Sequence, residues 1–207
     1  MPKANNVQDI DRPPVQQRGR KATQAILRAS LDLAEESGLD AVTVEGIAEH
    51  SGIAKTTIYR RWPNVSHILM DAVLSQVNEA APIEERSTVR ETFAVSMKLL
   101  IKLYAGRNGK ILRALIGRAQ VDASLREAIE ARWVEPRRRL AREILRSGIR
   151  RGEIRPDLDA DIVLDVLYGA IDHRLLVPYK NAKLNERFAE EILDAVFGGV
   201  TAKPGVS

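Results

Sequence analysis

Apolar residues recur every three or four positions along most of the chain, which is the spacing of helices with one buried face. Ile26, Ala29 and Leu33 form the first such stripe, and Gly38 supplies a residue suited to ending the helix. The same spacing predicts helices over residues 21–37, 43–51, 54–61, 64–78, 88–104, 109–120, 124–150 (with a bend at Pro136), 159–177 and 185–197. Strict alternation of apolar and polar residues, which is typical of strands, is scarce. The pattern therefore predicts an all-α fold of about nine helices.

Prolines and polar runs divide this helical pattern into three parts. The polar start of the chain, with Pro13 and Pro14, predicts a disordered arm over residues 1–18. Residues 80–87 contain Pro82 and several charges but few large apolar side chains, which indicates a hinge. We therefore expect an N-terminal domain over residues 19–79 with three helices around a helix-turn-helix, and a C-terminal helical bundle over residues 83–200.

The composition limits which kinds of chemical site and which cellular compartment are expected for this chain. The 207 residues are 44% hydrophobic, enough to build a core, and they include no cysteine that could form a disulfide or a thiolate metal site. His50 and His67 lack carboxylate partners at metal-binding spacing, so we expect no metal and no cofactor. No apolar stretch is long enough to cross a membrane, which predicts a soluble, cytoplasmic protein. The net charge of +4 alone says little about partners.

Residues 39–62 contain the most informative segment, two short helices joined by a tight turn. Thr43 can cap the first helix, and Gly52 permits the sharp turn before the second. Val44, Ile47 and Ile58 would pack the two helices together. This pattern predicts a helix-turn-helix whose second helix enters the major groove of double-stranded DNA.

The side chains left outside this apolar contact mix hydroxyl groups with long cations, the chemistry that meets phosphates and base edges. The residues expected to contact DNA are Arg20, Thr43, Lys55, Thr56, Thr57, Tyr59, Arg60 and Arg61. We assign Lys55, Thr56 and Thr57 to base edges or flanking phosphates. Thr43, Tyr59 and Arg60 are assigned chiefly to phosphates. Two alternatives stay open: a helical hairpin with a solvated cationic face, and a merely solubilising role for the basic cluster around Arg20.

Residues 20–70 resemble the DNA-binding part of tetracycline-repressor (TetR) family regulators. The resemblance rests on Thr43, Ile47-Ala48, Ser51-Gly52-Ile53, Lys55, Thr57-Ile58-Tyr59 and Trp62 before Pro63. It departs at Ala54, where the family often has a capping Ser, and at Val65, where it often has a phosphate-binding Lys. An Ala cap costs about 1 kcal/mol of helix stability. Both departures remove possible phosphate contacts.

The last two predicted helices are candidates for a dimer interface. The helix beginning at Asp159 (residues 159–177) is apolar around most of its circumference, and the helix beginning at Asn185 (residues 185–197) adds Phe188, Ile192 and Phe197. The TetR resemblance implies a homodimer through a four-helix interface of these segments. A two-fold dimer would also read two half-sites, whereas one short helix reads few bases. An ordinary buried core pair is the alternative.

A small-molecule pocket is expected among the helices between residues 88 and 177. The candidate lining residues are Phe93, Met97, Leu100, Tyr104, Leu115, Trp133, Tyr168 and His173. Each of these could equally be an ordinary core residue. His173, between Asp172 and Arg174, is the most unusual polar group in an otherwise apolar helix.

These features predict a DNA-binding repressor that a small, largely apolar effector releases from its operator. A non-specific architectural DNA-binding protein and an activator without an effector are the alternatives, and the long C-terminal half favours a sensor over a simple clamp. The sequence lacks a phosphate-binding glycine loop, a nucleophile elbow and paired catalytic carboxylates, so an enzyme is not expected.

Overall fold

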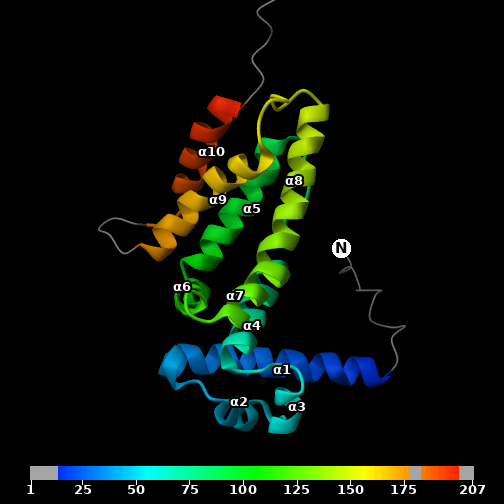
Figure 1. Ribbon diagram of the computed structural model, residues 1–207, viewed down its shortest axis with the longest axis vertical. Helices are drawn as coiled ribbons and strands as arrows, with labels where there is room; N and C mark the ends of the chain where they lie inside the picture. Colours follow the sequence, from blue (N-terminus) through cyan, green and yellow to red (C-terminus); the bar gives the residue numbers. More distant parts are fainter. Residues whose placement is uncertain (1–13, 178–182, 201–207) are drawn as a thin grey trace, which may run out of the picture. The chain divides into compact units, whose positions relative to one another are not determined.

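The computed structural model describes residues 14–177 and 183–200, in which helices dominate (Figure 1). They are α1 (Pro14–Ser37), α2 (Val44–Ser51), α3 (Lys55–Tyr59), α4 (Val65–Ala80), α5 (Val89–Tyr104), α6 (Arg107–Ala119), α7 (Ala123–Ile129), α8 (Glu135–Arg150), α9 (Ala160–Leu176) and α10 (Glu186–Val200). A short 3-10 turn covers Leu39–Ala41 and a π-helical turn covers Glu130–Val134. The all-α prediction is confirmed. Within the described residues, no helix is long and apolar enough to cross a membrane.

The chain divides into two compact units between Ala72 and Val73, inside α4. The hinge predicted near Pro82 therefore lies about ten residues beyond the division. The reason is that Val77 and Ala81 are fully buried, and the Ala81 carbonyl accepts a hydrogen bond from Arg137 at 3.2 Å. The last turns of α4 and the segment after them belong to the second unit, while the helix itself continues across the boundary.

Helix α1 begins at Pro14, earlier than the start at residue 21 that the apolar stripe predicted. Proline suits the first helical position, because its fixed φ is already helical and its missing N–H would have had no partner there. The prediction of a disordered arm over residues 1–18 is thus wrong for its last five residues. The remainder, residues 1–13, lies outside the described residues.

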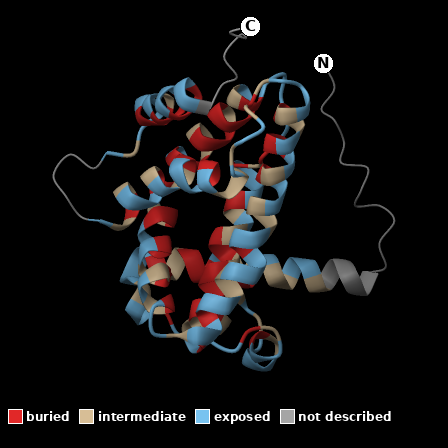
Figure 2. Cartoon of the chain, turned by 45° about the horizontal axis from the view of Figure 1, so that its top comes forward, coloured by how far each residue is buried: buried red, intermediate tan, exposed pale blue. Residues whose placement is uncertain are grey.

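The first unit is built around three isoleucines from three helices. Ile26 of α1, Ile47 of α2 and Ile58 of α3 are fully buried, and α1 packs against α2 (Figures 1 and 2). Trp62 follows α3 and is almost completely buried, with its indole Nε1–H donating to Asp71 Oδ2 of α4 at 2.7 Å. The segment after α3 is therefore fixed both by packing and by a charge-assisted hydrogen bond.

The second unit is organised around α5, which packs against α6, α8 and α10. Helix α9 packs in turn against α6, α8 and α10. The backbone of α8 comes so close to α5 that a Cβ added at Gly148 would lie 2.3 Å from Val89 Cγ2. Such an approach is open only to glycine, which explains a residue of low helix propensity inside α8.

A π-helical turn joins α7 to α8 where the sequence predicted one helix with a bend at Pro136. The turn spans Glu130–Val134, and Pro136 lies in the first turn of α8. Proline lacks an N–H and its ring crowds the carbonyl four residues earlier, so regular α-helical hydrogen bonding is interrupted just before it. The irregularity is therefore a local widening of the helix ahead of the proline.

Candidate functional site

The helix-turn-helix is fixed by hydrogen bonds at both ends of its turn. Thr43 Oγ1 accepts from the Gly46 backbone N–H at 3.0 Å and caps α2. Gly52 has a φ of 69°, in the left-handed region that glycine occupies without strain. Ser51 Oγ accepts from the Ile53 N–H at 3.3 Å. These local bonds set where α3 begins relative to α2.

Helix α3 buries one side and leaves the other exposed. Ile58 is fully buried, whereas Tyr59 is 54% exposed and Lys55, Thr56 and Arg60 are exposed as well. Thr57 is half-buried. Ala54, at the start of α3, supplies no side-chain cap, as its lack of a hydroxyl requires. The polar side chains predicted to meet DNA on α3 thus lie on the accessible side of a short helix.

An ion pair links the two helices across this surface. Lys55 Nζ lies 3.1 Å from Glu45 Oε1, and both side chains are more than half exposed. The pKa of Glu45 is lowered, first by a hydrogen bond from its own backbone N–H and then by Lys55. Exposed ion pairs of this kind contribute little to the stability of the folded state. Lys55 can therefore exchange Glu45 for a phosphate at small cost.

Two of the predicted DNA-contacting arginines have different surroundings from the rest. The Arg61 guanidinium donates to the Gly19 carbonyl at 3.1 Å and to Thr23 Oγ1, so it ties the end of α3 to α1. Arg61 therefore has a structural role within the unit, which the sequence pattern did not reveal. Arg20 is exposed on α1 and not on a tail, so its position relative to the rest of α1 is fixed by the helix. Thr43 is also exposed. Its hydroxyl oxygen accepts the capping hydrogen bond from the Gly46 N–H, so its hydroxyl hydrogen takes no part in that bond.

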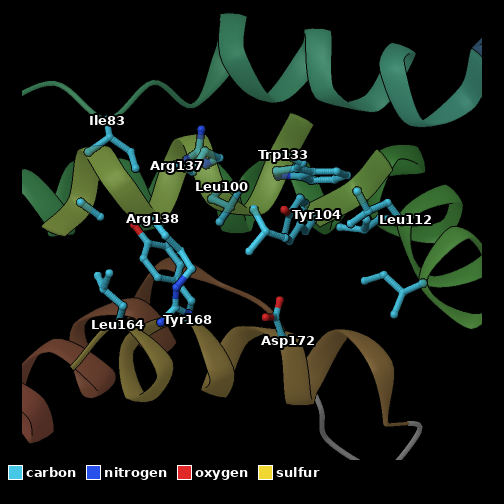
Figure 3. A pocket seen from close by; sticks show the side chains of 14 residues that line it. Ile83, Leu100, Tyr104, Leu112, Trp133, Arg137, Arg138, Leu164, Tyr168 and Asp172 are labelled. Atoms are coloured by element: carbon cyan, nitrogen blue, oxygen red, sulfur yellow. The ribbon is translucent and has the colours of Figure 1, made fainter. Parts of the chain in front are cut away.

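A cavity of about 180 Å³ lies within the second unit, between α5, α6, the α7–α8 region and α9 (Figure 3). Its walls are formed by Ile83, Leu100, Tyr104, Leu112, Ile116, Ile129, Trp133, Val134, Arg137, Arg138, Ala141, Leu164, Tyr168 and Asp172. Most of these side chains are apolar or aromatic, as in small-molecule sites generally.

Four of the eight residues predicted to line a pocket do so. The structure brings Leu100, Tyr104, Trp133 and Tyr168 together in the cavity wall. The other four, Phe93, Met97, Leu115 and His173, are not among its lining residues. The first three of these have no solvent exposure and fill the core, and the Phe93 ring packs edge-on against Tyr168 at 6.3 Å between centroids. His173 is exposed.

Asp172 is the acidic side chain of the cavity wall, and it is not among the lining residues predicted from the sequence. It follows Leu164 and Tyr168 at steps of four residues, which place all three on one face of α9. Figure 3 shows its carboxylate directed from α9 towards the wall that carries Tyr104. Solvent reaches the side chain, but the protein atoms crowded around it raise the pKa of its carboxyl to about 6. The four-residue spacing was the signal that could have identified it.

The two arginines of the cavity wall are engaged with other groups. Arg137 turns outward in Figure 3 and donates to the Ala81 carbonyl. Arg138 pairs with two carboxylates of α9, at 2.7 Å from Asp161 Oδ1 and 2.5 Å from Asp165 Oδ1. Burial raises the pKa of Tyr104, Asp172 raises it further, and Arg137 opposes the effect. Tyr104 therefore lies within the electrostatic reach of both Asp172 and Arg137.

The face of α9 opposite the cavity carries exposed apolar side chains. Ile162 is 61% exposed and Val166 is 53% exposed, and Val177 just after the helix is also exposed. Gly169 lies on the same side, and a Cβ added there would meet no other atom within 4 Å. Helix α9 thus has a cavity face and a separate, uncovered apolar face.

Comparison with known proteins gives consistent matches over both units. Residues 26–69 match the family model described as bacterial regulatory proteins, tetR family, and residues 83–196 match that of the tetracyclin repressor-like C-terminal domain. The Bacillus subtilis HTH-type transcriptional regulator YdeS is 35% identical over 86% of this chain and 89% of its own. The DNA-binding transcriptional repressor TetR of Mycobacteroides abscessus is 25% identical over 91% and 97%. The crystal structure of the TetR family transcription regulator SCO0332 is 31% identical, with a TM-score of 0.75 over 87% and 98%.

Proposed function

Because the chain belongs to the TetR family of helix-turn-helix transcriptional regulators, we propose that it is a repressor that a small molecule in the second unit releases from its operator. The observation that carries the DNA-binding part is the division of α3 into a buried Ile58 and an exposed polar side. Lys55, Tyr59 and Arg60 on that side supply the cations and hydroxyl that DNA contacts require. The sign of regulation is supported by the similarity to a named repressor.

Thr43, Thr56, Thr57 and Arg20 complete the proposed DNA-contacting set. Arg61 is left out, because its guanidinium is occupied by α1. In this arrangement the exposed residues of α3 meet the major groove, and Thr43 at the start of α2 meets a phosphate. Arg20 would reach the backbone from α1.

The proposed repressor is a homodimer through α9 and α10. The uncovered stripe of Ile162, Val166 and Gly169 on α9 supports this assignment. A glycine inside a helix costs about 1 kcal/mol relative to alanine, and no neighbour in the described chain accounts for it. A helix of a second copy crossing at Gly169 would account for both the exposed side chains and the small residue.

The proposed switch is a shift between two populations of the dimer. An effector in the cavity contacts α5, α8 and α9 of the second unit, and α4 runs from that unit into the DNA-binding unit without interruption. An effector that binds more tightly to the arrangement unable to bind DNA therefore weakens DNA binding, and DNA weakens effector binding by the same free energy.

DNA binding is tested by selecting bound genomic fragments and then measuring affinity against salt concentration. Lys55→Ala should weaken binding and reduce the slope of log affinity against log salt by about 2 per dimer, one phosphate contact for each protomer. Tyr59→Phe should weaken binding with little change of slope, because it removes no charge. Lys102→Ala, at an exposed lysine of the second unit, is the control. An unchanged affinity in both α3 variants would refute the assignment of this surface.

Sedimentation velocity tests the dimer. Val166→Glu places a charge on the uncovered stripe of α9 and should shift the protein towards monomers. Val121→Glu makes the same change at a side chain that is 91% exposed outside the stripe, and it should leave the dimer intact. Equal effects of the two substitutions, or none from either, would contradict the α9 interface.

A further inference from the structure

We propose that the cavity selects a cationic amine carried on one aromatic ring or a short apolar group, with Asp172 as the group that recognises the charge. This inference rests on the proposed function, because it names the chemical class of the effector. It rests on the distribution of charge around the cavity and on the size of the space.

Asp172 is the acidic side chain of the wall, and its carboxylate has no ion-pair partner within residues 14–177 and 183–200. The carboxylate also forms no hydrogen bond within these residues. The carboxylate faces the cavity in Figure 3. A carboxylate crowded by protein atoms gains most from a partner that brings both a positive charge and N–H donors. A protonated amine supplies both.

The arginines do not offer the same opportunity to an anion. Arg138 is neutralised by Asp161 and Asp165, so an anionic ligand would have to displace two carboxylates at 2.7 and 2.5 Å. Arg137 directs its guanidinium out of the cavity to the Ala81 carbonyl. The charged group directed into the cavity is therefore the carboxylate of Asp172, while the positive charge of Arg137 lies behind the wall at the Ala81 carbonyl.

The remaining walls fit the rest of such a ligand. Trp133 and Tyr104 provide aromatic rings, which attract cations through their faces and pack against apolar groups. The volume of about 180 Å³ slightly exceeds the roughly 150 Å³ cavity that accommodates benzene. The space therefore accommodates one ring and a few more heavy atoms.

The test measures the binding of three probes of the same shape to the full-length protein by titration calorimetry. They are phenethylamine, phenethyl alcohol and phenylacetate, which differ chiefly in the charge of the polar end. The amine should bind at least about tenfold more tightly than the alcohol, and phenylacetate should bind most weakly. Asp172→Asn should remove the preference for the amine and leave alcohol binding unchanged. Glu127→Gln, which neutralises an exposed acid of α7, should preserve the preference.

Three results would overturn the proposal: no binding of the amine, tighter binding of phenylacetate, or an amine preference that survives in Asp172→Asn. Adding the amine to the complex with a selected DNA fragment separates this inference from the proposed function. Amine binding that is lost in Asp172→Asn supports the cavity assignment even if the protein does not bind DNA, which would defeat the proposed function alone. Release of DNA by the amine in the parent protein, but not in Asp172→Asn, would support both.

Discussion

Replacing Asp172 by Asn should stabilise the protein near neutral pH, because protein atoms crowd around this carboxylate in the folded state and remove part of its hydration. Its pKa is raised from 3.8 to about 6 by burial. A fully sealed carboxyl with that change would cost the folded state about 3 kcal/mol when ionised. Because the residue is exposed to solvent, we expect a smaller cost of about 1 kcal/mol. Asp172→Asn should therefore raise Tm by about 2–4 °C at pH 7.5.

The dependence on pH distinguishes this explanation from a general packing effect. A pKa that is higher in the folded than in the unfolded state means that wild-type stability falls as the pH rises from 3.8 through 6. The advantage of Asp172→Asn should thus be small below about pH 4, grow as the pH rises towards 6 and level off above that value. Thermal unfolding of both proteins across this range, followed by circular dichroism, measures the difference. A difference that stays constant with pH, or a less stable variant at pH 7.5, would refute the reasoning.

Two further substitutions test the packing of each unit. Gly148→Ala should lower the free energy of unfolding by about 1–3 kcal/mol in urea titrations, since the new Cβ would lie 2.3 Å from Val89 Cγ2. Gly117→Ala is the control, because its new Cβ would meet no atom within 4 Å, and it should be neutral or slightly stabilising. Trp62→Phe should cost about 2–3 kcal/mol by removing the donor to Asp71. An unchanged urea midpoint for Trp62→Phe would show that this hydrogen bond contributes nothing.

Local patterns were sufficient to predict the helix-turn-helix and its exposed side. The buried positions Val44, Ile47 and Ile58 follow from apolar spacing, and the turn follows from Gly52. Each of these features depends on residues close together in the chain. The role of Arg61 could not be predicted in this way, because its partners Gly19 and Thr23 lie about forty positions away.

The cavity was predicted less well for the same reason. Aromatic character alone selected Phe93 along with Tyr104 and Tyr168, although Phe93 fills the core. On α9, His173 was predicted to line the cavity. Side chains of adjacent residues in an α-helix point about 100° apart. The neighbour of His173, Asp172, lines the cavity instead. Which side of α9 faces a cavity depends on α5 and α8, and this cannot be read from α9 itself.

Helix α9 is a single rod of 17 residues that carries Tyr168 and Asp172 on one side and Ile162 and Val166 on the other. A rigid rod needs no relay of intermediate side chains to carry a displacement from one side to the other, because both sides move together. The two sides also occupy different positions in its sequence. In the proposed repressor, substitutions on the cavity side of α9 can therefore change which effector binds while leaving the proposed dimer interface untouched, and new specificities become accessible one residue at a time.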